Sequence, residues 1–125
     1  MKRVTLMVIS LSLTSGAFAA DRPCPGTNGA ERTECIEKAL KASEGELKRV
    51  FSQSIASINS KNYEFIPKLE RDKWKATAEH AQSAWTTYRD AECRTVLYSW
   101  WGGSGASAAI MECLLVKTQS RIKEL

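Results

Sequence analysis

Four cysteines constrain this chain of 125 residues more than any other feature: Cys24, Cys35, Cys93 and Cys113. They form no C-x-x-C pair and the chain has a single histidine, so a structural zinc site is disfavoured. A chain of this size has a modest hydrophobic core, which gains from covalent cross-links in an exported protein. The sequence therefore predicts two disulfides, with no metal and no other cofactor.

Residues 1–19 have the pattern of a secretory signal peptide. Lys2 and Arg3 precede an apolar run over 4–13, and the sequence Ala-Phe-Ala at 17–19 supplies the small residues of a cleavage site. The run is too short to span a bilayer, and no cysteine stands at the cleavage point to accept a lipid. We expect a signal peptide over 1–19 and a single soluble domain over 20–125, located in the periplasm or secreted.

Charge narrows the class of partner. The chain carries a formal net charge of +4, but removing Lys2 and Arg3 leaves 16 basic against 14 acidic residues. The domain also lacks the dense lysine and arginine clusters that follow a phosphate backbone. We therefore expect a protein partner, no nucleic acid and no stable membrane anchor.

Three amphipathic segments account for most of the domain. Apolar residues between 36 and 58 recur at helical spacing and predict a first helix over about 30–60. Pro67 suits the first turn of a second helix, which should reach about Tyr98 with Trp74, Trp85 and Tyr88 on its apolar stripe. It is long enough to lie antiparallel along the whole first helix. A third helix is expected over about 106–125. The predicted fold class is all-α, an antiparallel up-down-up bundle of three main helices.

This topology brings all four cysteines to one pole of the bundle. Three pairings remain open, because the geometry excludes none of them. We favour Cys24 with Cys35 and Cys93 with Cys113, since these pairs enclose the shortest stretches of chain. In the loop-entropy model each disulfide adds roughly 3 kcal/mol to the free energy of unfolding.

The same pole carries two adjacent tryptophans and a glycine-rich loop over 102–105. Two neighbouring tryptophans at a helix end cannot both point inward, so at least one should be half exposed, and tryptophan is a common anchor of binding hot spots. The alternative is a tight turn that needs positive φ beside tryptophans that only cap the core. The predicted binding residues are Arg89, Trp100, Trp101, Gly102, Gly103 and Ser104.

A second group of residues has mainly a structural interpretation. Arg89 or Asp90 should tie the second helix to the third through a charge-assisted hydrogen bond. The alternative interpretation is a charged pair at a binding surface. The expected structural network comprises Trp85, Tyr88, Asp90, Thr118 and Arg121, with Trp85 and Tyr88 packed in the core.

Catalytic groups are scarce. His80 lies among polar residues, and Ser104 lacks the preceding strand of a nucleophile elbow. Glu44 and Glu46 have the character of surface charges on a helix. We predict no catalytic residue and no enzymatic activity.

Several motifs resemble the LprI-like lysozyme-inhibitor family of exported bacterial proteins. They are W-x-x-Y-R-D-x-x-C at 85–93, Gly-Gly-Ser at 102–104 and T-x-x-R-x-x-x-L at 118–125, with Glu46, Leu47 and Phe51 upstream. The resemblance covers nearly the whole mature chain. This sequence differs from the family at Lys48, where the family commonly has asparagine. It also lacks the lipid anchor of the member for which the family is named.

The resemblance implies a binding protein that blocks a muramidase by steric occlusion, with a lysozyme as its partner. At a net charge near +2 the domain gains no long-range attraction to a strongly basic lysozyme, so an acidic muramidase suits it better. The alternative function is an envelope stress or assembly protein that has no lysozyme target.

Overall fold

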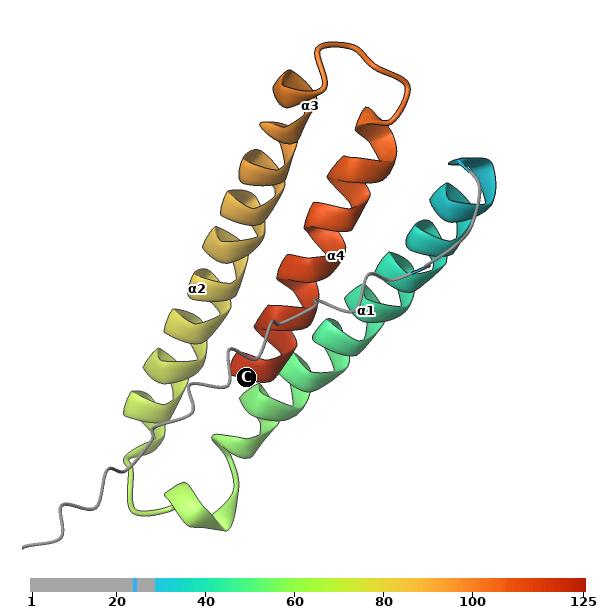
Figure 1. The fold of residues 1–125 in the computed structure, drawn as a ribbon. Helices are drawn as coiled ribbons and strands as arrows, with labels where there is room; N and C mark the ends of the chain where they lie inside the picture. The colour runs from blue at the N-terminus through green and yellow to red at the C-terminus, as the bar shows by residue number, and fades with distance from the viewer. Residues whose placement is uncertain (1–23, 25–28) are drawn as a thin grey trace, which may run out of the picture.

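The computed structural model describes Cys24 and residues 29–125 (Figure 1). The predicted signal peptide and its cleavage site lie outside these residues. The elements in chain order are α1 (Gly29–Ser57), the 3-10 helix η1 (Lys61–Tyr63), α2 (Lys68–Arg94), α3 (Val96–Ser99) and α4 (Ala106–Glu124). The described residues contain no strand, so the prediction of an all-α bundle of three main helices is confirmed.

Helix α4 lies between α1 and α2, and both pack on it (Figure 1). The most extensive packing joins α1 to α4, whereas the described parts of α1 and α2 barely touch each other. Helix α2 therefore packs mainly on α4, and it meets α1 across a groove. The buried apolar side chains come from all three long helices and the turn after α1: Ile36, Leu47, Ile58, Cys93, Ala106 and Leu115.

Helix α2 exposes aromatic residues that its apolar stripe placed in the core. Tyr88 is 57% exposed and Trp74 is 41% exposed, while Trp85 is half-buried. Because α2 packs chiefly against one long neighbour, only the edge of its stripe that faces α4 is covered. The prediction that Tyr88 and Trp74 pack in the core was wrong. The ring of Trp74 instead meets Tyr63 of η1 edge-on, with 5.1 Å between the ring centroids.

The second helix is interrupted earlier than expected. It ends at Arg94, and after Thr95 the short helix α3 continues to Ser99. The hydroxyl of Thr95 donates a hydrogen bond to the carbonyl of Glu92 at 2.6 Å. Such local bonds give the backbone an alternative to a regular helix. No described helix combines the length and the apolar character that crossing a membrane requires.

Candidate functional site

Both disulfides lie toward one end of the bundle. Cys93 of α2 is bonded to Cys113 of α4, and Cys24 is bonded to Cys35 of α1, so the favoured pairing is confirmed. An ion pair of 2.6 Å between Arg32 of α1 and Glu112 of α4 places the start of α1 beside the Cys93–Cys113 disulfide. We call this end of the molecule the disulfide pole.

The chain reverses at the disulfide pole through residues 100–105, between α3 and α4 (Figure 1). Trp101 and Gly102 both have positive φ, at 46° and 78°, and the amide of Gly103 donates to the carbonyl of Trp100 at 2.8 Å. A Cβ atom at Gly105 would overlap the ring of Trp100. The glycines therefore serve the backbone turn and the close approach of the Trp100 ring.

The two tryptophans differ in exposure. Trp101 is 92% exposed and Trp100 is 46% exposed. The expectation that at least one of them would be half exposed is confirmed. Trp100 packs on Gly105, which leaves the Trp101 ring as the most exposed large apolar side chain among the described residues.

A pocket of about 350 Å³ lies beside this loop. The first turns of α1 form one wall and the loop forms the other, and the lining includes Arg32, Thr33, Trp100 and Ser104. Arg32 was not singled out by the sequence, because its place at the pole depends on how α1 packs on α4. The pocket brings a guanidinium, two hydroxyls and an aromatic ring together, which suits recognition of a polar surface.

Arg89 is the one predicted binding residue that the structure places away from the loop. It is only 7% exposed and lies in the middle of the bundle, between α2 and α4. Its Nη1 donates to the hydroxyl of Thr118 at 2.8 Å and its Nε donates to Asp90 at 2.8 Å. The hydrogen bond expected between the second and third long helices is therefore present.

The other members of the expected network are divided between two faces. Trp85 receives the guanidinium groups of Arg89 and Arg121 over its ring, at 5.4 and 5.6 Å from the centroid. Arg121 also donates from Nε to Gln82 at 3.1 Å. Tyr88 is 57% exposed, and its partners are Lys117 and Glu92, which are not members of this network.

Tyr88 belongs to a separate polar bridge between α2 and α4. Lys117 pairs with Glu92 at 2.6 Å and lies 5.3 Å from the centroid of the Tyr88 ring. Hydrogen bonds from Lys117 and from the Tyr88 hydroxyl lower the pKa of Glu92. The Glu92 carboxylate in turn raises the pKa of Tyr88 and the pKa of Lys117.

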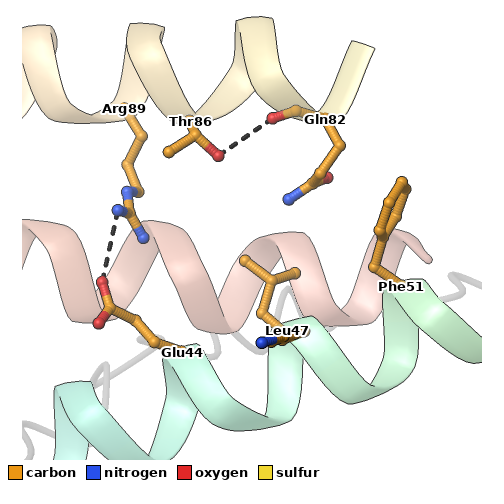
Figure 2. Close-up of a pocket in the computed structure, with 7 residues that line it drawn as sticks. Glu44, Leu47, Phe51, Gln82, Thr86 and Arg89 are labelled. Atoms are coloured by element: carbon orange, nitrogen blue, oxygen red, sulfur yellow. Dashed lines mark hydrogen bonds and ion pairs between the residues drawn. The ribbon is translucent and has the colours of Figure 1, made fainter. Parts of the chain in front are cut away.

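A groove between α1 and α2, with α4 passing behind it in Figure 2, holds a second pocket of about 280 Å³. Figure 2 shows Arg89, Thr86 and Gln82 on one side, facing Glu44, Leu47 and Phe51 on the other. Sequence reasoning missed this groove and treated Glu44 as a solvated charge. Steps of three and four residues on α1 (44, 47, 48, 51) and on α2 (82, 86, 89) mark one face of each helix, but no pattern shows that the two faces oppose each other.

The described residues hold no group of three or more histidine, cysteine, aspartate or glutamate side chains that could bind a metal ion. His80 is exposed on α2.

Comparison with known proteins gives a family. A family model described as lysozyme inhibitor LprI matches residues 24–125. The chain belongs to the LprI family. The matched range contains both disulfides, the loop at the disulfide pole and the groove between α1 and α2. No curated protein and no solved structure matches the chain significantly.

Proposed function

We propose that this LprI-family protein is an exported inhibitor that binds a lysozyme and blocks its substrate cleft. The surface that enters the cleft is the loop over residues 100–104, with Trp101 as its anchor. The family match supports the class of partner. Two disulfides support export, because disulfides persist in oxidising compartments such as the periplasm or the extracellular space.

The observation that carries the proposal is the 92% exposure of Trp101 on the loop that leads into α4, the helix that the Cys93–Cys113 disulfide joins to α2. Leaving so large a ring in water is costly, whereas burying it against a partner is worth several kcal/mol before the entropic cost of association. The disulfide holds α2 against α4, so little conformational freedom is lost when the loop binds.

Polar groups beside the loop suit the chemistry of a lysozyme cleft. Glycoside hydrolases of this type carry a pair of carboxyl groups at the reacting bond. Ser104 and Arg32 line the same pocket at the disulfide pole and both can donate hydrogen bonds. We propose that they meet these carboxyl groups, a role that Arg89 cannot fill because it is buried in the middle of the bundle.

The test is a lysis assay on a cell-wall suspension, with one animal-type lysozyme and one acidic bacterial muramidase. Oxidised protein should slow lysis by at least one of the two enzymes, and reduced protein should not. Trp101→Ala should raise the concentration for half-inhibition by roughly 30-fold, the value of a hot-spot residue worth about 2 kcal/mol.

Phe65→Ala is the matched control for a general effect of exposed aromatic rings. Phe65 is 80% exposed in the connection between α1 and α2, at the other end of the bundle. This variant should inhibit as well as the unchanged protein. An excess of protein that leaves both enzymes unaffected would reject the proposal and favour an envelope partner other than lysozyme.

A further inference from the structure

We propose that the groove between α1 and α2 is a second binding site, which takes a small carboxylate with an apolar body. This inference does not depend on lysozyme inhibition. At 1.5 Å per residue, Leu47 in the groove lies about 20 Å along α1 from Thr33 at the disulfide pole. The two pockets share no lining residue.

The charge of the groove favours an anion. Arg89 and Lys48 line it with positive charge, and Glu44 is the only acidic lining residue. The Arg89 side chain is almost completely buried, so its guanidinium acts in a medium that screens charge less than water does. Asp90 also pairs with Arg89, so once Glu44 turns into water the charges of Arg89 and Lys48 against Asp90 leave one net positive charge beside the pocket.

Glu44 is the group that a ligand carboxylate would replace. Its distance of 3.4 Å from Nη2 of Arg89 is the longest of the polar contacts of that guanidinium, whereas Asp90 approaches the same nitrogen to 2.7 Å. About half of the Glu44 side chain is exposed, so it can turn into water at little cost. Arg89 then exchanges one carboxylate for another and is never left buried without a partner.

The apolar body of the ligand has a surface to cover. Leu47 is buried at the base of the groove and Phe51 stands at its edge (Figure 2). A ligand that covers these side chains gains free energy because their apolar surface is removed from water. The side-chain amide of Gln82 points into the groove and offers a further polar contact.

The volume limits the size of the ligand. About 280 Å³ lies just below the range of roughly 300 to 1,000 Å³ that is usual for pockets that bind drug-sized molecules. A phenyl ring joined to a carboxylate by a short alkyl chain has suitable dimensions. We therefore choose 4-phenylbutanoate as the probe and the uncharged alcohol 4-phenylbutan-1-ol as its matched control.

Binding is measured on the oxidised full domain by calorimetry and by amide chemical shifts. The acid should bind saturably and shift the amides of Leu47, Thr86 and Arg89. The alcohol should bind about tenfold more weakly, because it cannot form charge-assisted hydrogen bonds with Arg89. Equal affinity for acid and alcohol would overturn the proposal, as would shifts confined to the disulfide pole.

Two variants on α1 separate competition by Glu44 from a general charge effect. Glu44→Gln should tighten binding of the acid about fivefold, because the competing charge is removed. Glu46→Gln removes the same charge outside the groove, where Glu46 pairs with Arg49, and should leave the affinity unchanged. Equal effects of the two substitutions, or weaker binding by Glu44→Gln, would contradict the proposal.

Discussion

Trp85, in the middle of α2, has two guanidinium groups over its ring, whereas Trp101, on the loop at the disulfide pole, is almost fully exposed. Both belong to regions rich in polar and aromatic side chains. In the middle of the bundle most of these side chains bond to one another and hold helices together, although Arg89 also lines the groove between α1 and α2. At the pole the main-chain turn and a disulfide hold the structure, so the side chains are available to a partner.

This contrast implies that the Cys93–Cys113 disulfide contributes more to stability than any single side chain of the buried network. Replacing both Cys93 and Cys113 by serine should lower the free energy of unfolding by about 3 kcal/mol, because the bond closes a loop with a sequence separation of 20. Urea unfolding of the double variant against the oxidised protein measures the loss. A loss under about 1 kcal/mol would mean that packing of α2 on α4 holds the pole without the disulfide.

Removing Arg89 should have the next largest effect. Arg89→Ala leaves the buried hydroxyl of Thr118 without its hydrogen-bond donor and should lower the free energy of unfolding by about 2 kcal/mol. Thermal and urea unfolding give the value.

Two control variants test whether the loss of stability is specific to the buried Arg89 network. Arg94→Ala removes the same charge at an exposed position in the last turn of α2, and Trp101→Ala removes an exposed ring at the pole. Each should change the free energy of unfolding by no more than about 0.5 kcal/mol. If Arg94→Ala costs as much as Arg89→Ala, the charge of α2 matters and the buried network does not.

Much of the pole could be predicted from the sequence because its determinants are local. Helical periodicity sets the three long helices, and short chain separations favour the observed disulfides. Adjacent tryptophans before a glycine-rich turn force one ring outward whatever the tertiary packing. The roles of these residues in binding remain predictions.

The middle of the bundle could not be predicted because its geometry depends on which helix lies at the centre. Helical spacing showed an apolar stripe on each helix, but not that α4 would separate α1 from α2. That arrangement exposes Tyr88 and creates the groove where Glu44 meets Arg89. Nothing in the local sequence distinguishes Glu44 from its solvated neighbours.

Glu92 lies one turn from Arg89 toward the pole, and its link to Lys117 tests how much an exposed bridge contributes. The link lowers the pKa of Glu92, so its stabilising effect is present above the unfolded-state pKa of about 4.3 and is lost as the pH falls through the lower folded-state pKa. The same link raises the pKa of Lys117. Its stabilising effect is therefore fully present below the unfolded-state pKa of about 10.4 and is lost only as the pH rises through the higher folded-state pKa. Glu92→Gln should therefore be slightly less stable than the unchanged protein at pH 7, and the difference should shrink as the pH falls below the unfolded-state pKa.

Thermal unfolding of both proteins between pH 3 and pH 8 measures this difference in stability. It should be smaller than the losses expected for the cysteine double variant and for Arg89→Ala, because the side chains of Glu92 and Lys117 are both in contact with water. Raising the salt concentration to about 1 M at pH 7 should shrink it further, since exposed charges are screened. A difference that persists unchanged at pH 3 would mean that Glu92 acts through packing against Tyr88 and not through its charge. The exposed bridge would then resemble the Arg89 network more closely than the accessible surfaces of these side chains indicate.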